Sequence, residues 1–256
     1  MEIAVVLRAV PDPVEELELN DDASDLDREY LGFVLNEFDD HALEEALLIK
    51  EQVGGSVTVY AAGTADEVEQ MLYTAVAKGA DLAVKLGDGL DALDAHAHAD
   101  LMIEAMAGKT FDLILCGVQA ADELDGQVAM LIAARLGIRH ASVVVGANPD
   151  DDGLRVTKEF WGGVTADYKV DTPAVLGVQA ARQAPRYVAV SRIRQAQESD
   201  ALEERDIGQP AASGRVHITA VRIPETGAAA EMISGDETAA AEKILELLKT
   251  AGVGGI

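Results

Sequence analysis

Short apolar runs alternate with amphipathic stretches along roughly the first 140 residues. Four of these runs have the length and composition of buried strands, and turn-forming or charged residues bound them. They cover residues 3–7, 56–62, 82–86 and 112–117. Between them, apolar residues recur every three or four positions, as on one face of a helix. The predicted helices begin after Asn36 and then cover residues 66–78, 94–107 and 126–136.

Strands and helices that alternate at this spacing predict an α/β fold, with a mainly parallel sheet sandwiched by helices. In the helix after Asn36, Asp39 or Asp40 is expected to cap the first turn. Val53 is expected to belong to the buried face of that helix, just before the glycine pair Gly54-Gly55 that ends it.

After residue 141 the pattern changes to strand-like runs with no helix between them. These runs cover residues 142–146, 154–160, 164–170 and 174–178. Because no linker separates them from the first half, they are interpreted as β-hairpins added to the same sheet. Residues 188–199 are neither clearly a strand nor a long helix.

The C-terminal part is expected to form an arm. Residues 213–223 have a strand-like pattern, residues 225–235 are small and predicted to be flexible, and residues 237–250 carry apolar side chains at helical spacing. Terminal arms of this kind often dock on a partner. The predicted division is an α/β domain over residues 1–199 and an arm with a helix over residues 200–256.

Charge changes the picture of possible partners. The chain has 46 Asp and Glu residues against 20 Lys and Arg residues, which is a formal net charge of −26. Such a surface repels nucleic acid and anionic membranes, so neither is expected as a partner. Two explanations remain, an acidic face for a basic partner or the acidic surface of a halophilic protein. The acidic residues are spread along the whole length and Arg outnumbers Lys, which favours the halophilic explanation.

Other sequence features argue against several kinds of site. No apolar run approaches the ~20 residues that span a bilayer, and the chain enters a strand directly rather than a signal peptide, so a cytoplasmic protein is expected. The single cysteine, Cys116, is expected in the core. His96-x-His98 would form a metal pair only on a strand, and it lies in a predicted helix, where positions i and i+2 diverge. No metal site is therefore predicted.

Residues 112–137 form the candidate binding region. An apolar strand, a loop of small and acidic residues, and a helix start follow one another here. Unpaired backbone N–H groups in the first turn of a helix attract phosphate oxygens. The loop has neither Gly-x-Gly-x-x-Gly nor a Walker pattern, so an ordinary strand-to-helix connection is the alternative. In a parallel sheet, the tips after Leu7, Ala62 and Gly117 would meet at one edge, where ligands bind. Arg8 and Asp12 either orient such a ligand or pair with each other.

Four stretches in order resemble the beta subunit of electron transfer flavoproteins. They are IAVVLRAVPD at residues 3–12, NEFDDHALEEALLIKE at 36–51, GVQAADELDGQVA at 117–129, and KEFWGGVTADYKVDTPAVLGV followed by APRYVAVSRI within 158–193. The resemblance covers essentially the whole chain. It implies the adenine nucleotide alpha hydrolase-like fold, in a carrier subunit rather than a stand-alone catalyst, with no catalytic residue of its own.

The resemblance also implies a heterodimer with an alpha subunit that carries the redox-active FAD, on which residues 200–256 dock. A further nucleotide, AMP or a second FAD, would bind in this chain. By position, its site comprises Val6, Asn36, Ala62, Gly63, Asp122, Gly126, Gln127, Val128 and Ala129. The backbone of residues 126–129 would hold phosphate.

This sequence departs from the family pattern in the nucleotide loop. AMP-binding members usually have Asp-Asp-x-Asn-Gln-Thr-Gly, whereas here Gly126 replaces the Asn and Val128 replaces the phosphate-binding Thr. The Gln127-Val128 pair is closer to the FAD-binding, electron-bifurcating relatives. Both AMP and a second FAD therefore remain candidates for the nucleotide of this chain, and FAD is favoured.

The resemblance places a partner-recognition loop at residues 188–194, with Val190 and Ile193 as its contacts. Its implied partners are acyl-CoA or other flavin dehydrogenases and a quinone oxidoreductase, although Gln195 and Gln197 stand in place of the family's basic run. Read without the resemblance, Val190 is a half-buried residue. Trp161 either shields a flavin or packs on its neighbours at a hairpin tip. The alternative function is a stand-alone nucleotide-binding protein of the universal-stress or hydrolase-like type.

Overall fold

The computed structural model describes residues 1–27, 31–63, 66–87, 93–123, 125–150, 153–208, 214–216, 218–224, 230 and 232–253. The strands are β1 Glu2–Val6, β2 Ala9–Pro11, β3 Phe33–Leu35, β4 Ser56–Ala62, β5 Leu82–Leu86, β6 Leu113–Gly117, β7 Arg139–Asp150, β8 Gly153–Phe160, β9 Val164–Val170, β10 Ala174–Val178 and β11 Leu202–Arg205. The helices are α1 Glu37–Val53, α2 Asp66–Lys78, α3 Ala95–Ala105, α4 Val128–Leu136, α5 Val190–Gln197 and α6 Glu237–Thr250, and a short 3-10 turn covers Trp161–Gly163.

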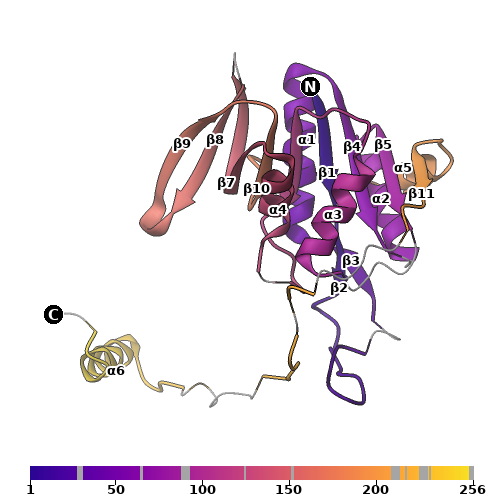
Figure 1. Ribbon diagram of the computed structural model, residues 1–256. Helices are drawn as coiled ribbons and strands as arrows, with labels where there is room; N and C mark the ends of the chain where they lie inside the picture. Colours follow the sequence, from indigo (N-terminus) through magenta and orange to yellow (C-terminus); the bar gives the residue numbers. More distant parts are fainter. Residues whose placement is uncertain are drawn as a thin grey trace.

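A nine-stranded sheet forms the centre of the molecule, in the order β11-β5-β4-β1-β6-β10-β7-β8-β9 (Figure 1). All pairs from β11 to β7 are parallel, whereas β8 and β9 continue the sheet as antiparallel strands. A separate two-stranded sheet joins β2 to β3. The predicted α/β class with a mainly parallel sheet is confirmed.

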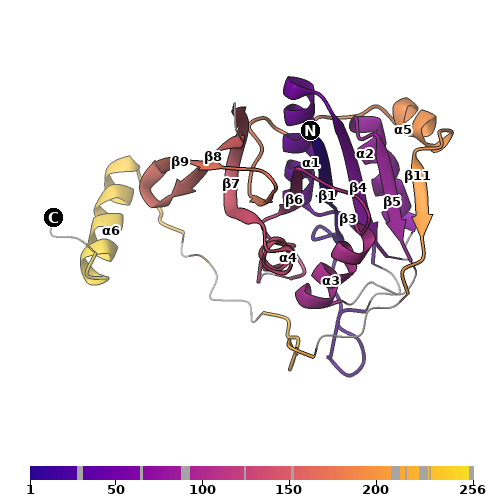
Figure 2. The same cartoon turned by 45° about the horizontal axis from the view of Figure 1, so that its top comes forward.

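The central strands are apolar on both faces because helices cover both. Successive side chains of a strand point to opposite faces. Ile3 and Val5 of β1 therefore pack in the core beneath α1 and α2, whereas Ala4 and Val6 pack in the core beneath α3 and α4. Figure 2 shows the two pairs of helices on opposite sides of the sheet. Cys116 belongs to the second core, as predicted.

The first helix differs in two details from the sequence prediction. It begins at Glu37 with Asn36 in the N-cap position, so the assignment of the cap to Asp39 or Asp40 was wrong. Asp39 is buried in the first turn and accepts hydrogen bonds from other elements. Val53 is exposed at the end of the helix, so its assignment to the buried face was wrong too.

The second half adds antiparallel hairpins to the sheet, as predicted, but the last strand predicted there, β10, does not belong to them. β7, β8 and β9 form antiparallel hairpins that carry the sheet outward from its parallel part. β10 does not extend these hairpins. It returns to the middle of the sheet, where it pairs in parallel with both β6 and β7.

Residues 188–208 return to the opposite edge of the sheet. The region without a clear pattern contains the short helix α5, and β11 follows it as the edge strand beside β5. The sheet therefore extends to Arg205, beyond the division that the sequence places at residue 199.

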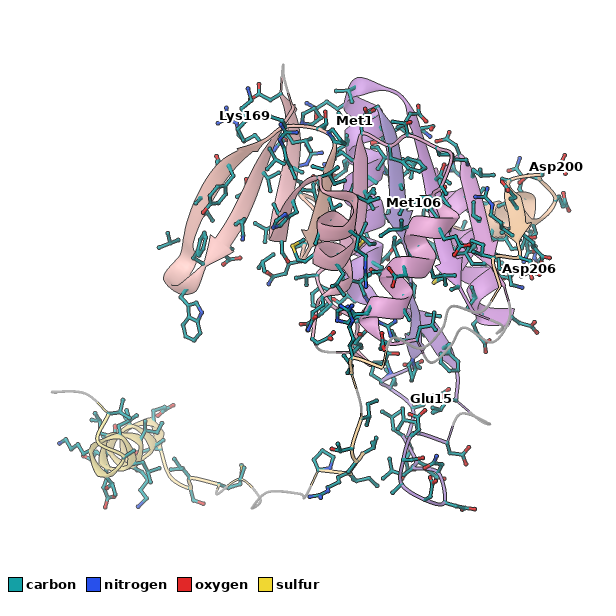
Figure 3. The ribbon with its side chains drawn as sticks, viewed as in Figure 1. Met1, Glu15, Met106, Lys169, Asp200 and Asp206 are labelled. Carbon is teal, nitrogen blue, oxygen red and sulfur yellow. The ribbon has the colours of Figure 1, made fainter. Side chains whose placement is uncertain are left out.

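The C-terminal arm carries a helix that lies apart from the sheet. α6 has the predicted bounds, and Ile244, Leu245 and Leu247 are exposed on it. Figures 1 and 3 show it separated from the body of the molecule. No strand occurs in the described residues 214–216 and 218–224, so the predicted strand-like extension was wrong there. Most of residues 225–235 lie outside the described residues. No described helix is long and apolar enough to cross a bilayer.

Candidate functional site

A cleft opens where β1 and β6 end side by side. Val6 and Cys116, which are paired in register, lie at its base. From β1 the chain proceeds to β4 and β5 on one side, while β6 lies on the other, so the strand order reverses at this point. Ligands of open parallel sheets bind at such reversals. The space between the walls, together with the open mouth, is about 340 Å³.

Five of the nine predicted nucleotide-site residues line this cleft. They are Val6, Asn36, Gly126, Gln127 and Val128. The Asn36 side chain donates to the Gln119 carbonyl oxygen at 2.9 Å, which ties the start of α1 to the loop after β6. The cleft is therefore assembled from segments that are far apart in the sequence.

The other four predicted residues do not line the described cleft. Ala62 is the last residue of β4 and Gly63 follows it, one strand further from the reversal. The Asp122 carboxylate turns toward Arg8, with Oδ1 3.7 Å from Nη2. Ala129 is buried in the core beneath α4. Their contact with a nucleotide stays a prediction.

The first turn of α4 opens toward the cleft without a side-chain cap. Gln127 occupies the N-cap position and makes no capping hydrogen bond, whereas Asp94 caps α3 through the N–H of Ala97 at 2.9 Å. Among the described residues, the backbone N–H groups of Val128 and Ala129 have no acceptor. Such groups carry the positive end of the helix dipole, so this turn favours an anion.

Gly126 shapes the turn that enters α4. Its φ is +61°, a conformation that glycine adopts without a steric penalty. A Cβ here would also lie 2.8 Å from the carbonyl oxygen of Val118, closer than such contacts allow. Gly126, which the sequence places in the predicted phosphate site, must therefore be a glycine because of the backbone geometry of this turn.

Asp39 joins three elements beneath the cleft. Its carboxylate accepts the backbone N–H of Gly117 at 2.7 Å and that of Arg8 at 3.0 Å, so it ties α1 to the ends of β1 and β6. Burial raises the pKa of Asp39 to about 7, against the lowering effect of its hydrogen bonds and of the nearby Arg8 charge. Sequence reasoning took this residue for a helix cap and missed its role.

The positive charge of Arg8 is taken up by acidic neighbours. It forms an ion pair with Glu123 and lies near Asp122. Burial raises the pKa of Glu123, while Arg8 lowers it. Asp12 instead accepts the backbone N–H of Val14 at 2.9 Å, so the surface pair of Arg8 and Asp12, one of the two alternatives from the sequence, is not formed.

His98 also lines the cleft, from the first half of α3. It is only 6% exposed. Burial, with a smaller effect of the Arg8 charge, lowers the pKa of His98 to about 3, so the imidazole is neutral. His96 points elsewhere, with Nδ1 3.3 Å from Nη2 of Arg135. No group of three or more potential metal ligands occurs in the part of the chain that is described.

Comparison with known proteins identifies the family. The family model described as "Electron transfer flavoprotein domain" matches residues 25–207, more than half of the chain. The chain belongs to the electron transfer flavoprotein family. The beta subunit of an electron transfer flavoprotein from Methylophilus methylotrophus is 30% identical over 97% of this chain and 98% of its own length. The corresponding subunit from Thermoanaerobacterium thermosaccharolyticum is 31% identical over 99% of this chain and all of its own length.

The segment that matches the family's recognition loop forms α5 on the edge of the sheet. Val190, its first residue, is 58% exposed, whereas Ile193 is partly buried. α5 packs against α2, and Gln197 Nε2 donates to Gln70 Oε1 at 3.0 Å. The interpretation of Val190 as exposed is supported, and its contact with a partner stays a prediction.

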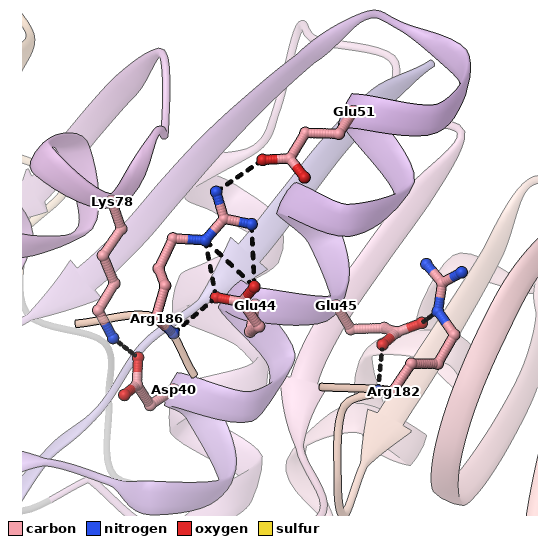
Figure 4. Close-up of polar contacts among 7 residues, drawn as sticks. All are labelled: Asp40, Glu44, Glu45, Glu51, Lys78, Arg182 and Arg186. Atoms are coloured by element: carbon pink, nitrogen blue, oxygen red, sulfur yellow. Dashed lines mark hydrogen bonds and ion pairs between the residues drawn. The ribbon is translucent and has the colours of Figure 1, made fainter. Parts of the chain in front are cut away.

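Two buried carboxylates of α1 fix the segment that leads to α5 (Figure 4). Residues 179–189 connect β10 to α5, and we call them the linker. Arg182 Nε donates to Glu45 Oε1 at 2.7 Å, and Arg186 Nη2 donates to Glu44 Oε1 at 2.9 Å. The backbone N–H groups of the same two arginines donate to the same two carboxylates. The linker is therefore held on α1 at two adjacent points.

The other end of the sheet presents exposed aromatic residues. Trp161 lies in the turn between β8 and β9 and is 99% exposed, so it does not pack on its neighbours as one of the two sequence interpretations had it. Phe160 and Tyr168 of the same hairpin are also exposed. In this family member, the hairpin and α5 thus occupy opposite edges of one sheet.

Proposed function

We propose that this chain is the beta subunit of an electron transfer flavoprotein and binds an adenine nucleotide in the cleft between β1 and β6. One observation carries the nucleotide assignment: the uncapped first turn of α4 opens into that cleft, at the point where the strand order reverses. Relatives over nearly the full length are named as beta subunits, which supports the wider assignment.

In this proposal, the chain binds and positions and performs no bond chemistry of its own. The backbone N–H groups of the first turn of α4 hold phosphate, and Val6 provides an apolar wall for the adenine. The redox chemistry is supplied by the FAD that the alpha subunit carries. A second FAD is favoured over AMP as the nucleotide of this chain, because Val128 has no hydroxyl for a phosphate.

We assign separate surfaces to the two classes of protein partner. Residues 200–256 contain α6, whose exposed Ile244, Leu245 and Leu247 suit docking on the alpha subunit. Val190 and Ile193 of α5 suit contact with acyl-CoA or other flavin dehydrogenases, and electrons pass on to a quinone oxidoreductase or another acceptor. The stand-alone nucleotide-binding protein is the weaker candidate, because it has no use for an exposed amphipathic helix.

The ligand is tested by co-expression with an alpha subunit, followed by denaturation of the complex and mass analysis of what is released. Two FAD per heterodimer would support bifurcating-type binding. One FAD with one AMP would support the proposed nucleotide site but show that its ligand is AMP rather than FAD. A stable complex that releases only one FAD and no second nucleotide would overturn the site.

The location of the phosphate is tested by Gly126→Val, which places a Cβ against the Val118 carbonyl oxygen at a positive φ. Gly108→Val is the matched control, because Gly108 has a φ of +80° and open space around it. We expect the first variant to lose the nucleotide and the second to keep it. Equal occupancy in both would show that the cradle lies elsewhere.

We also propose a cytoplasmic protein whose acidic surface is a halophilic adaptation. The formal charge of −26 repels itself when salt is removed, because screening weakens as the Debye length grows. This part of the proposal concerns the cell and the solvent and does not affect the assignment of the cleft.

A further inference from the structure

The imidazole of His98 is a polar group without a partner in the wall of the cleft. It is 6% exposed, and no other described residue forms a hydrogen bond with it. Among the described residues, the fully enclosed side-chain atoms without a partner are Tyr60 Oη and Arg182 Nη2, so the ring nitrogens of His98 reach the open cleft and can meet a ligand there. The sequence pattern singled out His98 only as half of an improbable metal pair, and no role described so far uses it.

We propose that His98 contacts the phosphate of the bound nucleotide, together with the first turn of α4. The inference rests on the proposed nucleotide site and adds a residue from α3 to it. α3 packs directly against α4, so His98 and the α4 turn face the same cleft from adjacent helices. An Arg135–Asp100 ion pair at 2.9 Å joins the same two helices.

The charges around His98 indicate which part of the ligand it meets. Arg8 lies close enough for its charge to act on the imidazole, and the α4 turn presents unpaired N–H groups. Because Arg8 is already paired with Glu123, the α4 turn is the positive group that remains, so the anionic part of a ligand is most stable beside that turn. The other charged or titratable groups of the cleft wall are Asp39, Cys116, Glu123 and Asp125.

His98 adds a side-chain donor from α3 to the Gln119 and Gln127 amides that also line this wall. The first turn of α4 carries the apolar side chains of Val128, Ala129 and Met130. The Arg8 guanidinium is already paired with Glu123. A neutral imidazole carries one N–H donor and one acceptor nitrogen, so it can donate to a phosphate oxygen without first taking up a proton.

The test compares the binding of AMP and adenosine to the nucleotide-free full chain by calorimetric titration. AMP contains the phosphoryl-adenosine unit that FAD shares, so the test does not depend on which nucleotide is natural. For His98→Leu we expect AMP to bind at least ~10-fold more weakly and adenosine to bind as it does to the wild type, because only the phosphate contact is lost. His96→Leu, the same change two residues away on α3 and outside the cleft wall, is expected to change neither.

Unchanged AMP affinity in His98→Leu would overturn the role of His98 and leave the nucleotide site intact. An equal loss for AMP and adenosine would also overturn the phosphate contact. If the wild type bound neither compound, the nucleotide site and the role of His98 would fail together.

A second measurement covers the case in which His98→Leu does not fold. In the wild-type chain, the side-chain ¹⁵N resonances of His98 should shift on addition of AMP and stay unchanged with adenosine. His98→Asn serves to assign the signal. An unshifted His98 signal at saturating AMP would refute the contact.

Discussion

The Glu44–Arg186 pair provides a quantitative test of how the linker is held. In Arg186→Met, Glu44 loses hydrogen bonds of 2.9 Å from Nε and from Nη2 and keeps only the backbone N–H of residue 186 at 3.0 Å. Glu44 is 3% exposed and Arg186 is 30% exposed, by side chain. Breaking a fully buried pair costs ~3–5 kcal/mol, and water entering from the exposed side reduces this, so we expect a loss of ~2–3 kcal/mol.

The assay is urea-induced unfolding followed by circular dichroism. Arg139→Met is the matched control, because the Arg139–Asp171 pair is 57% and 52% exposed and such pairs contribute only ~0–1 kcal/mol. Adding Glu44→Gln to Arg186→Met removes the buried charge and should restore part of the loss. The reasoning is refuted if Arg186→Met costs no more than the control, or if the second change restores nothing.

The remaining predictions concern the cleft and the surface. A Cβ on Gly117 would lie 2.5 Å from Asp39 Oδ1 and 2.9 Å from its backbone nitrogen, so Gly117→Ala should lower the free energy of unfolding by ~1–3 kcal/mol in urea titrations; a neutral result would contradict this packing. The pKa of Asp39 is raised from 3.8 to about 7, so its neutral form stabilises the fold below pH 3.8, and that contribution is lost as the pH rises through 7. Wild type should therefore lose stability relative to Asp39→Asn between pH 4 and 7.5, and parallel pH profiles would speak against it. With its charge of −26, the chain should lose circular dichroism signal on dialysis into dilute buffer, and an unchanged spectrum would rule out a salt requirement.

The sequence predicted the strands of the sheet better than the order in which they pair. Residues 174–178 are continuously apolar and were correctly assigned to a strand, but nothing local shows that this strand pairs with β6 and β7. β11 was missed because its sequence, Leu-Glu-Glu-Arg, is that of an exposed edge strand without an apolar face. Strand order depends on contacts between distant segments, which periodicity does not record.

The candidate site divides in a similar way. The loop around Gly126 was predictable, because a strand, small residues and a helix start are consecutive in the sequence. Asn36 and Val6 entered only through the family resemblance. Asp39 and His98 were missed because each reaches the cleft from a different helix, and a single acid or histidine in an amphipathic pattern resembles a cap or a surface residue.

α1 connects the two proposed binding regions of this protein, the nucleotide cleft and the partner-binding helix α5. Its N-terminal turn places Asn36 and Asp39 in the cleft, and two turns later Glu44 and Glu45 hold the linker that leads to α5. A helix of 17 residues is about 25 Å long and stiff along its axis. The carboxylate that ties β1 to β6 and the two carboxylates that hold the linker therefore keep fixed positions relative to one another. The cleft and the segment that leads to α5 are thus anchored on the same helix.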